Sequence, residues 1–290
     1  MSFTEHKATL LIAENKEEIP CLLHDPIIVA CLSSIEDHGC FTIALSGGSV
    51  PKFLANLRSS FEDMSIEPYF DKWHVCLADE RLVSSNHEDS NLKALREHLL
   101  ANVDIPPSQI YGIDETLLEY ESDENNPNRS EAIAASYEKN VISKLLSLSN
   151  GKLDCAVLGF GPDGHTCSLF PNHSLLKETT KLVASLDDSP KPPPSRITLT
   201  FPVLNDTRCV IFCGAGSSKS KVLQDSFSKI VRTDDGGDDY DVLINETKKE
   251  SDAYSSNIQP YPCAMIKPKS EMLIWIVDED AAEGLDIMDE

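Results

Sequence analysis

The sequence has little positive charge. Lysine and arginine number 25, against 48 aspartate and glutamate residues, which gives the 290-residue chain a net charge of −23. A field of this sign repels nucleic acids and anionic membranes. We therefore expect no nucleic acid and no membrane among the partners, and any anionic ligand must meet a local cluster of cations.

Several short motifs of known chemistry are also missing. The glycine stretch "ALSGGSVPKFLANL" (44–57) is neither GxxxxGK[ST] nor GxGxxG, so it does not support nucleotide binding, and the sequence contains no GxSxG of a serine hydrolase elbow. It has neither HExxH nor a CxxC pair, so nothing supports a zinc site. We expect no metal and no organic cofactor.

Signals for export are absent as well. The nine cysteines form an odd number and most lie in apolar runs such as "CVIFC" (209–213), which is typical of reduced core residues. The start "MSFTEHKATL" carries Glu5 and His6 before any apolar stretch, and no later run approaches the length that spans a bilayer. These features predict a cytoplasmic protein that is neither secreted nor inserted in a membrane.

Apolar runs and amphipathic stretches alternate along most of the chain. Many of the runs are apolar at both alternating positions, as in strands that helices cover on both faces. Strands are predicted over 8–13, 41–46, 73–79, 153–159, 196–200, 208–214, 263–267 and 272–277. Helices are predicted over 21–36, 51–60, 90–101, 130–148 and 217–230. This order predicts one α/β domain over 1–290, a three-layer α/β/α sandwich with a mostly parallel sheet.

Three acidic segments do not fit this alternation. Residues 119–130, 231–257 and the tail "DEDAAEGLDIMDE" are polar and poor in apolar residues, which predicts mobile insertions and a solvated tail. A divalent cation is the alternative ligand of such runs, but the ordered spacing of a calcium loop is missing.

The stretch "ALSGGSVPKFLANL" (44–57) is the first candidate site. A buried strand is expected to end at Ser46, Gly47 and Gly48 let the backbone approach a ligand, and Pro51 suits the first turn of a helix. Exposed amides at such a helix start bind phosphate. A turn that needs glycine for its geometry alone is the other interpretation.

The stretch "LADERLVSSNHEDSNLKAL" (77–95) is the second. Asp79, Glu80 and Arg81 follow a strand at the end where open parallel sheets bind ligands, and Asn91 starts the next helix. The alternative is a salt-bridged loop in which "DSN" caps the helix.

The stretch "LDCAVLGFGPDGHTCSLFP" (153–171) carries the strongest signal. Glycines at 159, 161 and 164 hold a loop close to a ligand, and Asp163 lies two residues before His165. A carboxylate beside an imidazole orients it and stabilises its protonated form, which general base catalysis requires. His165 is therefore the best catalytic candidate among the eight histidines.

Basic residues complete the candidate set. Arg196 opens the strand "RITLT" after the proline-rich "SPKPPPS", and Lys219 and Lys221 start a helix after "CGAGSS". Single exposed cations are usually surface charges, so these matter only if they converge near the loop of Ser46 to Ser49.

Together, these three stretches resemble the 6-phosphogluconolactonase family, which is related to the glucosamine-6-phosphate isomerases. The resemblance covers about residues 37–280, and "GPDGHTCSLFP" is its most specific part. It implies a modified doubly wound α/β sandwich that hydrolyses 6-phosphoglucono-1,5-lactone to 6-phosphogluconate in the oxidative pentose phosphate pathway.

The resemblance also assigns roles to residues. It implies a catalytic set of His165, Asp163 and Asp79. It places the substrate and its phosphate on a second set, with Lys221 as the alternative to Lys219: Ser46, Gly47, Gly48, Ser49, Arg81, Asn91, Arg196 and Lys219.

The mechanism expected from both lines of reasoning is hydrolysis without a covalent intermediate. His165 takes a proton from a water that attacks the lactone carbonyl. The partner is then a small sugar-phosphate lactone, and the chain is expected to be a monomer or a weak homodimer. An amino-sugar-phosphate isomerase is one alternative, although "DGHTCSLFP" lacks the glutamate that follows the histidine in that branch. A catalytically silent sugar-phosphate binding protein is the other.

Overall fold

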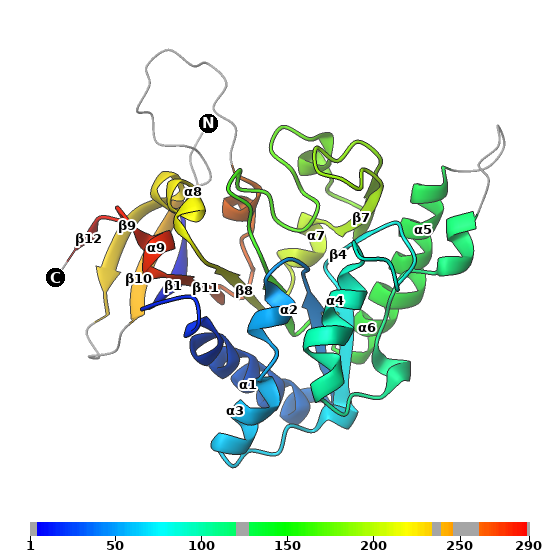
Figure 1. The fold of residues 1–290 in the computed structure, drawn as a ribbon, viewed down its shortest axis with the longest axis horizontal. Coiled ribbons are helices and arrows are strands. Elements are labelled where there is room, and N and C mark those ends of the chain that lie inside the picture. The colour runs from blue at the N-terminus through cyan, green and yellow to red at the C-terminus, as the bar shows by residue number, and fades with distance from the viewer. Residues whose placement is uncertain (1–4, 120–127, 234–238, 246–260, 289–290) are drawn as a thin grey trace.

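The computed structural model describes residues 5–119, 128–233, 239–245 and 261–288 (Figure 1). Most strands belong to one nine-stranded sheet, in the spatial order β12-β9-β10-β1-β11-β8-β5-β2-β3. Their bounds are β1 Glu5–Ala13, β2 Phe41–Leu45, β3 Trp73–Leu77, β5 Cys155–Leu158, β8 Cys209–Gly214, β9 Phe227–Arg232, β10 Asp239–Asn245, β11 Leu273–Asp278 and β12 Ile287–Met288. Only β10 pairs antiparallel, with β1 and β9, so the sheet is mostly parallel as predicted.

The remaining strands form a small antiparallel sheet of their own. Its order is β4-β7-β6, with β4 Asp79–Arg81, β6 Val183–Leu186 and β7 Arg196–Leu199. The sequence predicts β7 but not its separate sheet, and it does not predict β6. In this sheet Arg81 pairs with Arg196, which brings two candidate cations together.

The helices flank the large sheet. In Figure 1, α1 and α3 lie below the central strands and α8 lies above them. The helix bounds are α1 Ile19–His38, α2 Val50–Phe53, α3 Leu57–Asp63, α4 Asn91–His98, α5 Arg129–Tyr137, α6 Ser143–Leu148, α7 Phe201–Leu204, α8 Ser220–Ser226 and α9 Glu279–Ala282. The architecture is the α/β/α arrangement expected from the alternation.

Helix α1 corrects the expectation that no run approaches the length of a membrane span. Residues Ile19–His38 form the one helix of the described chain that is long and apolar enough to cross a bilayer, by length and composition only. Its buried residues include Leu23, Ile27 and Cys31, and the helix contacts β11, β8 and β2. A helix that covers the core of a sheet has the same composition.

Four other expectations are wrong in detail. The predicted strand 263–267 is mostly a 3₁₀ turn, Pro262–Met265, and the predicted helix 217–230 ends at Ser226, where β9 begins. Within the expected insertion 231–257, Asp239–Asn245 form β10, which pairs with β1 and β9 through an alternating buried pattern. The acidic tail holds α9, which Asp278 caps, and β12. The other expected insertion falls mainly on residues 120–127, outside the described chain.

Candidate active site

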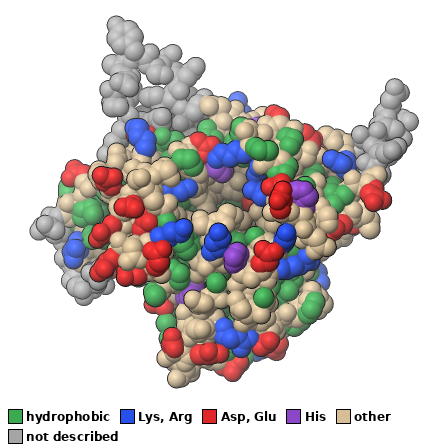
Figure 2. All heavy atoms as spheres, in the orientation of Figure 1, with side chains coloured by type: hydrophobic (Ala, Val, Ile, Leu, Met, Phe, Trp, Pro, Cys, Tyr) green, Lys and Arg blue, Asp and Glu red, His purple; other side chains and the backbone are tan. Residues whose placement is uncertain are grey.

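A pocket of about 230 Å³ lies at the carboxyl ends of four neighbouring parallel strands. Strands β2, β3, β5 and β8 run into its walls, at the edge where open α/β sheets bind ligands. Figure 2 shows a hollow near the middle of this face, with lysine and arginine side chains around it. The lining residues are Ser46, Gly47, Gly48, Ser49, Asp79, Arg81, Asn91, Gly159, Phe160, Gly161, Pro162, His165, Cys167, Arg196, Cys213, Gly214 and Lys219.

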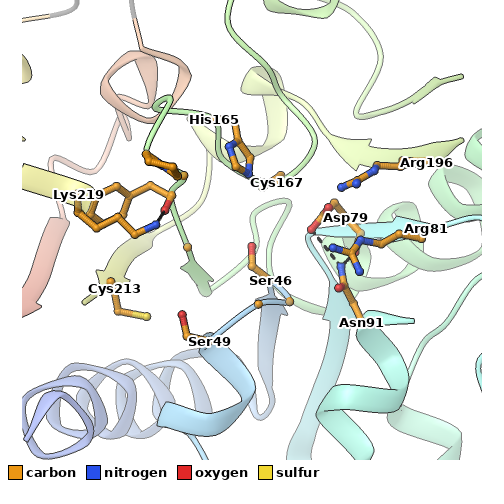
Figure 3. A pocket seen from close by; sticks show the side chains of 17 residues that line it. Ser46, Ser49, Asp79, Arg81, Asn91, His165, Cys167, Arg196, Cys213 and Lys219 are labelled. Atoms are coloured by element: carbon orange, nitrogen blue, oxygen red, sulfur yellow. Dashed lines mark hydrogen bonds between the residues drawn. The ribbon is translucent and has the colours of Figure 1, made fainter. Parts of the chain in front are cut away.

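Ten of the eleven predicted site residues line this pocket, and Asp163 contacts His165 from beside it. In Figure 3, Arg81, Arg196 and Asn91 lie on one side and Lys219 on the other, with His165 and Ser46 between them. The three sequence stretches 44–57, 77–95 and 153–171 therefore meet at one place.

The first wall is the turn from β2 into α2. Within the described chain, no hydrogen bond engages the backbone N–H groups of Gly47, Gly48 or Ser49. The Ser46 hydroxyl is buried and also has no partner there. Gly48 adopts a φ of +68°, and a Cβ on Gly47 would lie 1.9 Å from Oδ1 of Asn91. The glycines therefore serve both the turn and a close approach to the second wall.

The second wall is built from β4 and the start of α4. The side-chain amide of Asn91 donates to the backbone oxygen of Asp79 at 2.8 Å and to Asp79 Oδ1 at 3.3 Å. The Ser168 hydroxyl donates to Asp79 Oδ2 at 2.8 Å. Both oxygens of the Asp79 carboxylate thus have partners, which hold it in place at the pocket.

Glu80 fixes this wall from behind. Its buried carboxylate accepts the backbone N–H groups of Arg81, Asn91 and Leu92 and the hydroxyl of Ser90, at 2.8 to 3.0 Å. Burial raises the pKa of Glu80, and these hydrogen bonds oppose the rise. The expected helix cap is also present, because Ser90 accepts the N–H of Lys93. The loop that caps α4 therefore also forms this wall of the pocket.

The third wall is the loop 159–165, which we call the His165 loop. The Nδ1 atom of His165 lies 2.5 Å from Oδ1 of Asp163. A Cβ on Gly161 would lie 2.0 Å from the same ring nitrogen and 2.4 Å from the Asp163 oxygen. Only glycine therefore fits beside this pair.

Lys191 is the site residue that the sequence did not single out. Its ammonium lies 3.1 Å from His165 Nδ1 and 3.4 Å from Asp163 Oδ1, and it comes from the proline-rich "SPKPPPS". The one available signal was a lysine inside that rigid connection, directly before the predicted strand of Arg196.

The charges around His165 set its titration. Burial lowers the pKa of His165, the nearby Asp163 and Asp79 carboxylates oppose this, and the Lys191 charge adds to the lowering. Burial alone would raise the pKa of Asp163, but its hydrogen bond to His165 and the charges of His165 and Lys191 lower it. At neutral pH this arrangement favours a neutral imidazole beside an ionised carboxylate.

Arg196 is buried, and most of its hydrogen bonds go to the protein backbone. It is 3% exposed, and its guanidinium donates to the backbone oxygens of Lys191, Pro192 and Pro193 at 2.8, 3.2 and 2.9 Å. It therefore holds the loop that carries Lys191, with one edge left toward the pocket.

The two candidate lysines, Lys219 and Lys221, make different contacts. The ammonium of Lys219 donates to the backbone oxygen of Phe160 and lines the pocket. The ammonium of Lys221 donates instead to Asp225 at 2.6 Å. Burial lowers the pKa of Lys219, and the nearby Lys191 charge contributes. The geometry favours Lys219 as the pocket cation.

The described residues contain no group of three or more His, Cys, Asp or Glu side chains placed to hold a metal ion.

Two mammalian proteins are similar in sequence to most of this chain. The human 6-phosphogluconolactonase is 36% identical over 85% of this chain and 81% of its own length. The bovine 6-phosphogluconolactonase is 33% identical over 95% of this chain and 93% of its own.

Solved structures agree in fold. The 6-phosphogluconolactonase from Trypanosoma cruzi matches with a TM-score of 0.73 at 24% identity, covering 98% of both chains. A monomeric glucosamine-6-phosphate deaminase matches with a TM-score of 0.61 at 17% identity, covering 94% of this chain and 98% of the other. The family profile described as glucosamine-6-phosphate isomerases/6-phosphogluconolactonase matches residues 14–275. Since this match covers most of the chain, the protein belongs to the glucosamine-6-phosphate isomerase/6-phosphogluconolactonase family.

Proposed function

We propose that this protein hydrolyses 6-phosphoglucono-1,5-lactone to 6-phosphogluconate. The observation that carries the proposal is the His165–Asp163 pair, held in a pocket that also contains Arg81, Arg196 and Lys219. The curated relatives of similar length are named 6-phosphogluconolactonase, which supports the same reaction.

The hydrogen bond between His165 and Asp163 fixes which ring nitrogen acts. Because the lowered pKa keeps Asp163 ionised, the proton in this contact belongs to Nδ1 of His165. The lone pair of the neutral imidazole then lies on Nε2, which no hydrogen bond engages in the described chain. Nε2 is therefore the general base.

The reaction follows from this tautomer. Nε2 takes a proton from water as the water oxygen attacks the lactone carbonyl carbon, and the carbonyl oxygen becomes an oxyanion. When the tetrahedral intermediate collapses, the bond from that carbon to the ring oxygen breaks and the imidazolium returns its proton to the ring oxygen. Asp163 stabilises the imidazolium between these steps.

The phosphate would be held by cations and amides together. Arg81, Arg196 and Lys219 bring positive charge to the pocket, while Asp79 is the single carboxylate among its lining residues. The unengaged amides of Gly47, Gly48 and Ser49 add hydrogen-bond donors without adding flexible side chains. This local positive charge would attract an anionic substrate to a protein whose net charge is −23.

The isomerase reaction has weaker support. It needs a base for the proton at C2, and the residues after His165 are Thr166, Cys167 and Ser168. Asp79 is the remaining carboxylate at the pocket, and its oxygens are engaged by Asn91 and Ser168. A silent binding protein has weaker support as well, because the histidine pair and its loop are intact.

The test is hydrolysis of freshly generated 6-phosphoglucono-1,5-lactone by the wild type, by His165→Asn and by a blank without enzyme. We expect the variant to lose about 10²–10⁴-fold in turnover, the range of a general base, while it still binds 6-phosphogluconate. His98→Asn, on α4 outside the pocket lining, is the matched control. Near wild-type turnover by His165→Asn would contradict the assignment, and wild-type rates equal to the blank would contradict the reaction.

The net charge and the cysteines bear on the partners and on the location of the protein. The negative net charge supports the absence of nucleic acid partners. All nine cysteines are described and none forms a disulfide, which supports a reducing compartment such as the cytoplasm. A monomer or a weak homodimer is the proposed state, and sedimentation velocity would measure it.

A further inference from the structure

The His165 loop is supported by a residue that no part of the mechanism uses. Gly164, directly before His165, has a φ of +78°, and a Cβ there would lie 2.1 Å from Cδ1 of Tyr261. The Tyr261 ring therefore packs directly on the Gly164 backbone. The N–H of Cys263 also donates to the Gly164 oxygen at 3.0 Å.

Tyr261 is itself fixed by two residues of α8. Its hydroxyl donates to Asp225 Oδ2 at 2.8 Å, and the ammonium of Lys221 donates to Asp225 Oδ1 at 2.6 Å. Asp225 is 8% exposed. Burial and the nearby Asp225 charge raise the pKa of Tyr261 far above its usual range, so the hydroxyl keeps its proton and remains a donor.

The same helix is connected to the other end of the loop. Lys219, directly before α8, contacts the Phe160 oxygen, and Asp225 near the end of α8 holds the ring that covers Gly164. Within the loop, the backbone contributes the bonds from Gly161 to His165 and from Gly164 to Gly161. Because the loop has few hydrogen bonds of its own, its position depends largely on contacts with residues outside it, such as Tyr261 and Lys219.

We propose that Tyr261 is a positioning residue for His165, whose ring sets the backbone of Gly164 and is in turn held by Asp225 and Lys221. Gly164 has no side chain that could anchor the loop, and the Tyr261 ring that packs on its backbone anchors the loop instead. The kinetic consequence of this proposal rests on the proposed lactonase function. The structural consequence, a shift in the environment of His165, does not.

The experiment compares Tyr261→Ala and Tyr261→Phe with the wild type. A displacement of about 1 Å at a reacting group can cost about 10²-fold in rate, so we expect a fall of that order in kcat for Tyr261→Ala with little change in KM. Tyr261→Phe keeps the ring and loses only the bond to Asp225. The kcat of Tyr261→Phe should lie between the kcat of the wild type and that of Tyr261→Ala.

A second readout follows the His165 imidazole by NMR titration, with its resonances assigned by comparison with His165→Asn. Burial lowers the pKa of His165, while Asp163 and Asp79 oppose this and Lys191 reinforces it. Loosening the loop in Tyr261→Ala should expose the ring and move its pKa toward 6.5. A residue that only stabilised the fold would lower the melting temperature without moving this titration.

Tyr111 provides the matched controls. It is partly buried and its hydroxyl bonds to His74 at 2.9 Å, outside the pocket lining, so Tyr111→Ala and Tyr111→Phe should change neither kcat nor the His165 titration. Unchanged kcat and an unchanged titration in folded Tyr261→Ala would overturn the proposal. If Tyr261→Ala does not fold, the same unchanged values in Tyr261→Phe would overturn it. Should the wild type lack lactonase activity, a shifted titration would still support the positioning role.

Discussion

The Nδ1 atom of His165 lies 2.5 Å from Oδ1 of Asp163, and the Lys191 ammonium lies within 3.4 Å of both atoms. A contact this short needs a proton between the two atoms, and with Asp163 ionised that proton belongs to the imidazole. Lys191 then cannot donate to Nδ1 and acts as a charge beside the pair. Its presence strengthens the ionised state of Asp163 and weakens protonation of His165.

Lys191→Met should move the pH profile of the enzyme. The base must be neutral, so kcat/KM falls as the pH drops through the pKa of His165. The Lys191 charge lowers this pKa, so its removal raises the pKa and shifts the acid limb of the profile to higher pH. Steady-state rates measured from pH 5 to 8 on fresh lactone, corrected for spontaneous opening, check this.

Lys181→Met is the control for that shift. Lys181 is an exposed lysine paired with Glu131, outside the pocket lining, and its loss should leave the acid limb in place. An acid limb that stays at the wild-type position in Lys191→Met, or moves to lower pH, would show that Lys191 does not tune His165.

Gly161→Ala should disable the catalytic pair sterically. The added methyl would lie 2.0 Å from His165 Nδ1 and 2.4 Å from Asp163 Oδ1, so the two side chains must separate. Misplacement of this size can cost about 10²-fold in kcat. In Gly159→Ala the added methyl would lie 3.8 Å from Val50 Cγ2, which is an ordinary contact, so the loss of kcat should be far smaller. Equal rates in the two variants would contradict the steric argument.

The sequence predicted the main sheet and the pocket because both depend on local patterns. The runs Phe41–Leu45 and Cys209–Gly214 are mostly apolar and are buried at every position, and glycine-rich turns mark where these strands end. Since the ends of parallel strands share one edge, site residues far apart in sequence had to converge there.

The errors arose where tertiary pairing overrides composition. Asp239–Asn245 is acidic enough to suggest a loop, yet Val242 and Ile244 are buried in the core, while Asp241 is exposed and Leu243 is half-buried. The sequence did not indicate Lys191 for a related reason. Lys191 reaches His165 only in the folded chain, where Arg196 holds the proline-rich connection next to it. No local pattern encodes that contact.

Arg196→Lys and Arg81→Lys should have different effects, although both keep the charge. Arg196→Lys loses the fork of donors to the backbone oxygens of residues 191–193, and hydrogen bonds of a charged group are worth about 1.5–3 kcal/mol each. We expect a lower melting temperature and a lower kcat. In the described chain Arg81 donates to one backbone oxygen, that of Asp89, so Arg81→Lys should mainly raise KM. Thermal melts and steady-state kinetics would separate the effects, and a stable Arg196→Lys with raised KM alone would contradict this assignment.

Glu80→Gln should destabilise the wall that carries Asp79 and Asn91. The carboxylate accepts three backbone N–H groups and one hydroxyl, whereas glutamine has one acceptor oxygen and places an NH₂ group against donors. A buried donor left without a partner costs about 1–3 kcal/mol, so urea unfolding should show a loss of that order. Because the N–H of Asn91 is one of the four donors, kcat/KM should fall as well. Glu62→Gln, at an exposed position of α3, is the matched control and should change neither value. A Glu80→Gln protein as stable as the wild type would mean that α4 is held in place without this carboxylate.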